Sequence, residues 1–121
     1  MNPVAERRAR LTRLCAALPE AEVSGDQHLS FRVRQRTFAY YLNDHHGDGL
    51  IAVCCKAPAG DQAFLIARDP EHFYKPAYLG ARGWVSLRLD LPELSWEQVT
   101  RLVVTSYRLV APKRLAALAS V

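Results

Sequence analysis

The chain has 121 residues, half of them hydrophobic, and carries a formal net charge of +4 at pH 7. A chain of this length forms one domain over residues 1–121 and can bury a hydrophobic core without disulfides or bound metals. It contains no run of about 18 apolar residues, and its three cysteines form no disulfide pattern, so a cytoplasmic protein without a membrane span is expected.

The first predicted element is a helix over residues 2–18. Its apolar residues fall on one helical stripe, and Pro19 ends it because proline cannot continue a helix. The residues of this stripe are Val4, Leu11, Leu14, Cys15 and Leu18.

Three antiparallel strands are predicted next, over residues 29–34, 37–44 and 49–57. The first alternates apolar residues with arginines. Alternation in the second places Phe38, Tyr40 and Leu42 on one face, and the third is apolar on both faces as far as Lys56.

In the following segment, residues 61–68 predict a short helix. Asp69-Pro70-Glu71 has the composition of another helix start, with a cap, a proline at the first position and an acid in the first turn. The clearest strand of the chain spans residues 84–90, where Val85, Leu87 and Leu89 point inward.

A long helix is predicted over residues 96–110. Ser95 is its N-cap, and Gln98 three residues later completes a capping box. After Ala111, Pro112 is suited to begin a last short helix over residues 113–119. The expected buried stripe of the long helix is Trp96, Val99, Val103, Ser106 and Val110.

This succession of elements, α-β-β-β-α-β-α, predicts a single α+β domain in which helices cover an antiparallel sheet. A parallel sheet with crossover helices would contradict this prediction.

Three uncommon phrases stand in the second half of the chain: Lys-Ala-Pro-Ala-Gly-Asp-Gln (56–62), Tyr-Leu-Gly-Ala-Arg-Gly-Trp-Val (78–85) and Ser-Tyr-Arg-Leu-Val-Ala-Pro-Lys-Arg-Leu (106–115). With His28-Leu-Ser-Phe31 and Thr37-Phe-Ala-Tyr40, they resemble the YjbR-like (MmcQ/YjbR) family of small bacterial proteins over nearly the whole chain. The resemblance implies a YjbR-like, double-wing-like fold and a DNA-binding role, with no assigned reaction. The chain departs from the family pattern at Ala59, where a second proline is common before Gly60.

No catalytic or metal-binding pattern accompanies this resemblance. Cys54, Cys55 and Ser106 lie in no nucleophile motif, and the cysteines are expected to be buried. His45 and His46 are adjacent, so their side chains diverge, and a solvated loop is the favoured interpretation. The glycines form no phosphate loop. We expect a non-enzymatic protein without cofactor or metal.

The most informative cluster of residues is basic and aromatic. Arg82, Trp84 and Arg88 come from one turn and strand, so the indole could stack on a base while the guanidiniums neutralise phosphates. The alternative is that Trp84 belongs to the core and that Arg88 pairs with Asp90 or Glu93.

Two further basic groups allow two interpretations each. Arg32, Arg34 and Arg36 surround the first hairpin, where they could follow a nucleic-acid backbone or protect a sheet edge from aggregation. A third group could bind phosphates or stabilise the end of the long helix; it comprises Tyr107, Arg108, Lys113 and Arg114. Lys56 ends an apolar strand, where it either lines the rim of a cleft or extends into solvent.

Two functions are therefore weighed. In the first, a monomeric protein binds DNA through a basic surface, which requires that the arginines and lysines converge. In the second, a protein- or small-ligand-binding adaptor uses an apolar groove around Tyr74, Tyr78 and Trp84, and the basic residues are scattered.

Overall fold

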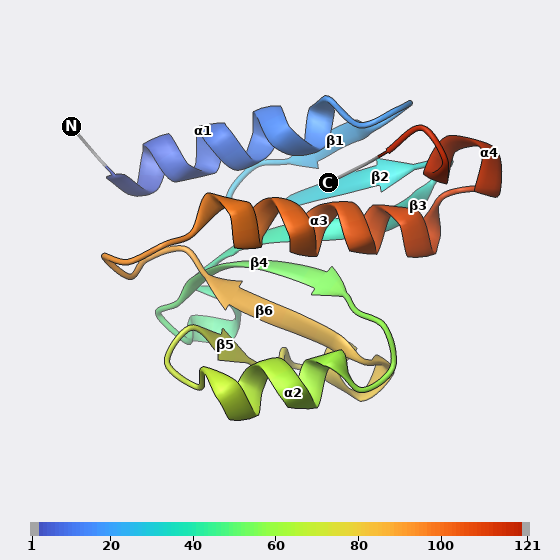
Figure 1. Cartoon of the computed structure of the whole chain (residues 1–121). Coiled ribbons are helices and arrows are strands. Elements are labelled where there is room, and N and C mark those ends of the chain that lie inside the picture. The colour runs from blue at the N-terminus through green and yellow to red at the C-terminus, as the bar shows by residue number, and fades with distance from the viewer. Residues whose placement is uncertain (1–2, 120–121) are drawn as a thin grey trace.

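One six-stranded antiparallel sheet forms the centre of the molecule, in the strand order β1-β2-β3-β4-β6-β5 (Figure 1). The structure is a computed structural model and describes residues 3–119. The strands are β1 (Glu22–Gly25), β2 (Leu29–Val33), β3 (Arg36–Asn43), β4 (Ile51–Lys56), β5 (Phe73–Tyr74) and β6 (Trp84–Arg88).

Two long helices, α1 (Pro3–Ala16) and α3 (Trp96–Val110), lie side by side across one face of the sheet (Figure 1). They touch where the Arg10 guanidinium lies 4.5 Å from the centre of the Trp96 ring. Helix α2 (Asp61–Arg68) packs beside β5 near one edge. The short helices within residues 3–119 are η1 (His45–Gly47), η2 (Leu79–Arg82) and α4 (Lys113–Ala116).

The hydrophobic core lies between this face of the sheet and the two long helices. Phe31, Val53 and Leu87 project from the strands and are fully buried. Phe38 meets Tyr107 of α3 edge to face, with 5.2 Å between ring centres. Each such side chain contributes about 1.5–3 kcal/mol by leaving water, so the packing of α3 on the sheet is a main source of stability.

The predicted α+β class and antiparallel sheet are confirmed. The four predicted strands and the long helix agree with the structure to within two residues at each end. The Ser95 cap is also confirmed, because its hydroxyl accepts a hydrogen bond from the Gln98 N–H at 3.2 Å. The first helix ends at Ala16 instead of residue 18, and its predicted start at residue 2 lies outside the described residues; the last helix ends at Ala116 instead of residue 119.

Two edge strands were not predicted, so four strands instead of three precede α2. All four residues of β1 are exposed, which leaves no apolar alternation to detect, and β5 has two residues only. The predicted helix start at Asp69-Pro70-Glu71 is wrong. These residues form a turn, in which the Asp69 carbonyl accepts a hydrogen bond from the Phe73 N–H at 3.0 Å and leads the chain into β5.

A β-bulge corrects the predicted face of β3. Phe31 is paired with Ala39 but Arg32 with Thr37, so Phe38 is the extra residue. It therefore points into the core together with Ala39 and Tyr41, whereas Tyr40 lies on the other face. The expectation that Phe38 and Tyr40 share a face is wrong because strict alternation does not survive a bulge.

The face of the sheet away from the long helices is covered in part by the segment between β5 and β6. Cys54 and Ser86 on this face are fully buried, and Leu79 of η2 lies near Tyr40 and Trp84. Among residues 3–119, no helix has both the length and the apolar character needed to cross a membrane.

Candidate nucleic-acid interface

Charge is distributed unevenly between the two ends of the sheet. Because the chain reverses direction at every turn, consecutive turns lie at alternate ends. We call the end where β2 and β4 finish and β3 and β6 begin the basic end; α3 and α4 finish there too (right side of Figure 1). Its cations are Arg32, Arg34, Arg36, Lys56, Arg82, Arg108, Lys113 and Arg114, and its acids are Glu20, Glu22 and Asp61.

The opposite end of the sheet is acidic. The β3–β4 turn carries Asp44 and Asp48, the segment after α2 carries Asp69 and Glu71, and other acids follow β6. Cations also lie at this end, among them Arg7, Arg8, Arg68 and Arg88. The charge asymmetry along the strand direction is therefore one of the turns, which are basic at one end and acidic at the other.

A cavity of about 380 Å³ opens at the basic end, on the sheet face away from the long helices. We call it the basic cavity. Its lining residues are Arg36, Thr37, Tyr40, Lys56, Leu79, Arg82, Trp84 and Val110. Seven of these eight residues belong to the sequence phrases that carry the family resemblance, and Arg36 directly precedes one of them.

Ser106 explains why the sheet opens here. The pairing of β3 with β4 stops at Ala39 and Cys55. Beyond that pair, the buried Ser106 hydroxyl of α3 replaces the next rung: it accepts a hydrogen bond from the Lys56 N–H at 2.9 Å and donates one to the Phe38 carbonyl. Strands β3 and β4 separate beyond this point, where their residues line the basic cavity.

The three cations of the basic cavity, Arg36, Lys56 and Arg82, have no acidic partner. No carboxylate among residues 3–119 comes within 4.0 Å of any of them. They come from separate segments, the start of β3, the end of β4 and η2. No ion pair within the described residues offsets their positive charge, so the cavity is suited to an anion.

The backbone around the cavity is held in place by specific contacts. The Gln62 side-chain amide donates hydrogen bonds to the carbonyls of Gly80, at 2.7 Å, and Trp84, which ties α2 to η2 and β6. Gly83 adopts a φ of 87° between η2 and β6, a conformation that other residues rarely adopt. Arg82 is therefore presented by a firmly anchored turn.

Trp84 lies in the cavity wall but offers little surface. It is 8% exposed and packs against Tyr40, with 5.8 Å between ring centres and an angle of 45° between planes. It therefore offers a base little surface for stacking. Tyr40 is more exposed and is the better aromatic neighbour for a ligand.

Two of the predicted site residues are engaged in ion pairs. Arg34 binds Glu20 through two hydrogen bonds of 2.6 and 3.0 Å. Arg88 binds Asp90 in the same way, through hydrogen bonds of 3.0 and 3.1 Å. Arg88 lies four residues after Trp84 on β6, so the backbones of these two residues are about 13 Å apart at the usual rise of a strand. The structure therefore does not bring Arg88 together with Arg82.

The other predicted site residues lie at the basic end, outside the cavity. Arg32 is the cross-strand neighbour of Thr37. Arg108 follows the buried Ser106 by two residues of helix and so faces outward from the sheet. Lys113 and Arg114 are exposed on α4. These cations surround the end of the domain instead of forming one flat face.

Thr37 and Tyr40 were missed as site residues, although both belong to the quoted phrase at 37–40, and Arg36 was named only with the hairpin group. A signal that could have singled out Arg36 is the charge of successive turns. It alternates from basic at 32–36 to acidic at 44–48, and the same alternation continues to the C-terminus.

The cysteines considered as candidate nucleophiles are not activated. Cys15, Cys54 and Cys55 are buried and unpaired. Burial raises the pKa of the Cys54 thiol to about 12, and it raises that of Cys55 well above the ordinary value. A thiol with so high a pKa is not ionised at neutral pH. Within residues 3–119, no three His, Cys, Asp or Glu side chains gather as a metal site would require.

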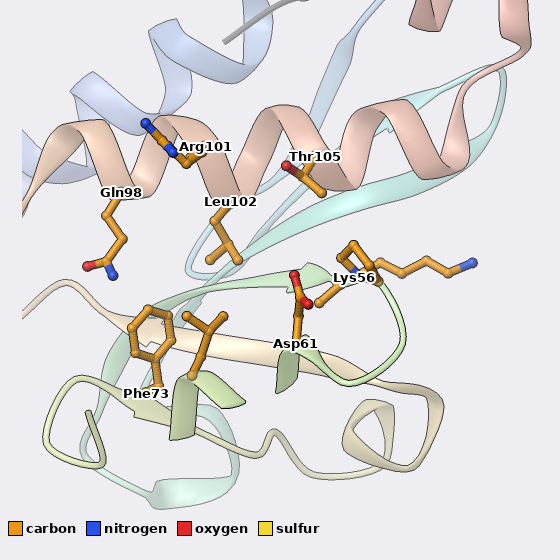
Figure 2. Close-up of a pocket in the computed structure, with 10 residues that line it drawn as sticks. Lys56, Asp61, Phe73, Gln98, Arg101, Leu102 and Thr105 are labelled. Carbon is orange, nitrogen blue, oxygen red and sulfur yellow. The ribbon is translucent and has the colours of Figure 1, made fainter. Parts of the chain in front are cut away.

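A second cavity, of about 180 Å³, lies between α2 and α3. Figure 2 shows Leu102 of α3 facing Phe73, whereas the Lys56 amine extends away from the cavity. Asp61 and Gln98 lie at its rim. This cavity is small and mainly apolar.

The apolar groove that an adaptor would require around Tyr74, Tyr78 and Trp84 is divided. Tyr74 lines a hollow with His45 and His46, whereas Trp84 lines the basic cavity. Tyr78 is 80% exposed on the segment between them.

Comparisons with known proteins agree with this architecture. No curated protein matches the chain. A crystal structure of Deinococcus radiodurans protein DR2400, with the family-model domain DUF419, matches with a TM-score of 0.70 and 23% sequence identity, over 84% of this chain and 76% of that one. At this identity the likeness concerns the fold alone. The family model named YjbR matches residues 16–109, most of the chain. The chain therefore belongs to the YjbR family.

Proposed function

We propose that this protein binds DNA without enzymatic activity, through phosphate contacts made by its basic end. The observation that carries the proposal is the convergence of Arg36, Lys56 and Arg82 on one cavity without an acidic partner among residues 3–119. Cations that are already paired within the protein gain little from a phosphate. Unpaired cations release condensed counterions from the nucleic acid when they bind it.

The charge asymmetry of the molecule supports the same proposal. A polyanion is attracted to the basic end and repelled by the acidic turns at the other, so the protein would meet DNA in one orientation. The cations come from turns and the ends of elements instead of from one helix face that could enter the major groove. Contacts to phosphates, with weak dependence on sequence, are therefore expected.

Titration of labelled DNA tests the proposal. The protein should bind single-stranded and duplex DNA at about 50 mM salt, and the double variant Arg36→Ala/Arg82→Ala should lose about tenfold or more in affinity. Arg68→Ala is the matched control, because this exposed arginine on α2 lies toward the acidic end and should be dispensable. Absence of binding, or full affinity in the double variant, would refute DNA binding by this surface.

A second candidate function, binding of a small apolar ligand, is favoured by the cavity between α2 and α3. If it operates, an apolar fluorescent probe should bind saturably and lose affinity in Leu102→Gln. Leu109→Gln changes an exposed leucine of the same helix and is the control. Equal effects of the two substitutions would speak against this site.

A further inference from the structure

We infer that the basic cavity binds a terminal phosphate, the phosphomonoester of a nucleotide at the end of a DNA strand or free in solution. The inference rests on the proposed function and deepens it by naming the chemical group that enters the cavity. The inference is based on three observations: the cavity is concave, it is lined by the cations Arg36, Lys56 and Arg82, and the backbone near Lys56 and Arg82 is held by hydrogen bonds.

The shape favours a group attached through a single bond. Residues of β3, β4, η2 and β6 line a hollow that is open to solvent, and Val110 of α3 contributes to it from the side of the long helices. An internal phosphate of a duplex has a sugar on both sides and lies on a convex surface, so it reaches into a hollow less easily. A terminal phosphate has one ester bond and can enter.

The charge of the cavity also fits this group. A phosphomonoester carries a charge of about −1.5 to −2 near neutral pH, more than the −1 of an internal phosphodiester. Arg36 and Arg82 can each offer a pair of parallel N–H donors, and Lys56 adds a mobile ammonium. Three cations therefore face the more highly charged anion.

The backbone that carries the cations is held in place by specific contacts. The turn before Arg36 has two residues, Arg34 and Gln35, both with positive φ, and the Arg34–Glu20 pair fastens it. Ser106 holds the backbone of Lys56, and Gln62 holds η2 next to Arg82. Less ordering of the backbone is therefore required on binding.

Two single-stranded oligonucleotides of one sequence, labelled at the 3′ end and differing only in a 5′-phosphate or a 5′-hydroxyl, provide the test. The phosphorylated strand should bind about tenfold more tightly, as expected for several charge-assisted hydrogen bonds. A third strand, phosphorylated at the 3′ end and labelled at the 5′ end, tests whether the cavity accepts a phosphate at either end of the strand. Adenosine 5′-monophosphate and adenosine compare the free nucleotide with its nucleoside.

Substitutions distinguish a specific site for a terminal phosphate from nonspecific electrostatic attraction of DNA to the basic end. Lys56→Gln and Arg82→Gln should each reduce the preference for the phosphorylated strand to within about twofold. Arg108→Gln, at the basic end but outside the cavity, should weaken both strands equally and keep the preference. Thermal unfolding of every variant checks that the fold is retained.

Each outcome has one meaning. If the strands bind equally whichever end is phosphorylated, and adenosine 5′-monophosphate binds no better than adenosine, the inference fails while DNA binding stands. If no strand binds but adenosine 5′-monophosphate binds in preference to adenosine, and Lys56→Gln abolishes this preference, the cavity serves a free nucleotide and the proposed DNA binding fails. If no phosphorylated compound is preferred and no strand binds, both are overturned.

Discussion

Ser106 is the single residue on which the shape of the candidate site depends most. Its hydroxyl is fully buried and uses both its donor and its acceptor capacity, for the Phe38 carbonyl and the Lys56 N–H. It thereby satisfies two backbone groups that the divergence of β3 and β4 would otherwise leave without partners.

Ser106→Ala is expected to lower the free energy of unfolding by about 1–3 kcal/mol, because it leaves a buried donor and a buried acceptor unpaired. Urea denaturation measures the loss. Ser86→Ala is the comparison: the Ser86 hydroxyl is equally buried but lies beside the Cys54 and Tyr74 side chains and bridges no backbone groups, so its removal should cost less. Equal losses in both variants would show that the Ser106 bridge contributes no more than an ordinary buried hydroxyl.

The His72 imidazole forms a pH-sensitive contact at the acidic end. Its Nδ1 lies 2.9 Å from the Asp69 carboxylate and its Nε2 lies 2.9 Å from the Glu93 carbonyl, so the protonated ring donates to both. The hydrogen bond to Asp69 is the main cause that raises the pKa of His72 above its ordinary value of 6.5. The same hydrogen bond lowers the pKa of Asp69.

A raised pKa in the folded state means that the folded protein binds this proton more tightly than the unfolded chain does. The stabilisation is then complete below the unfolded pKa of 6.5 and is lost as the pH rises through the raised value. His72→Gln should therefore cost more stability at about pH 5.5 than at about pH 9. Urea denaturation at the two pH values decides this, and an equal loss at both would contradict it.

Among the elements, the β2–β3 hairpin shows how local strain and charge combine. Its two-residue turn places both Arg34 and Gln35 at positive φ, 49° and 67°. Turns of this kind match the twist of the strands but favour asparagine and glycine. Neither residue here is of that type, and the Arg34–Glu20 ion pair helps to hold the turn.

Gln35→Gly should raise the free energy of unfolding by about 0.5–1 kcal/mol, because glycine adopts positive φ without steric cost and the gain exceeds its extra entropy in the unfolded chain. Thermal or urea denaturation measures the gain. Gln35→Ala retains the Cβ atom and should give no such gain. If alanine stabilises as much as glycine, the effect does not come from the backbone conformation.

At the scale of the whole molecule, the alternation of charge with chain direction is the main feature. Each reversal of the chain brings the next turn to the other end of the sheet, and basic and acidic turns alternate accordingly. Glu20 is an exception at the basic end, where it pairs with Arg34. The positive charge of the turns is thereby concentrated at the basic end, although the net charge of the molecule is only +4.

Binding to duplex DNA should depend steeply on salt. With a footprint of about four to six phosphates, the logarithm of the affinity should fall against the logarithm of salt concentration with a slope of roughly −4 to −5. Arg82→Ala should reduce the size of this slope by about one, and Arg68→Ala should leave it unchanged. A salt series for the three proteins measures the slopes, and indistinguishable slopes would exclude Arg82 from the interface.

Much of the fold followed from periodicity and capping. The strand over 84–90 and the helix over 96–110 have strong patterns and a clear N-cap at Ser95, and both were predicted. The exposed edge strand β1 has no apolar pattern, so its pairing with β2 is visible only in three dimensions. The bulge at Phe38 was missed for a related reason, since the partner strand determines where an extra residue fits.

By itself the sequence determined the family, the α+β class and the supply of cations, because these depend on residue types and local periodicity. It also brought Arg82 and Trp84 together, since they are neighbours in the chain. Only the tertiary structure decided that Arg36 and Lys56 join Arg82 in one cavity, whereas Arg88 turns to Asp90 at the other end. The reason is physical: which cations converge is set by where β3 and β4 separate around Ser106, and that contact joins residues 50 and 68 positions apart in the chain.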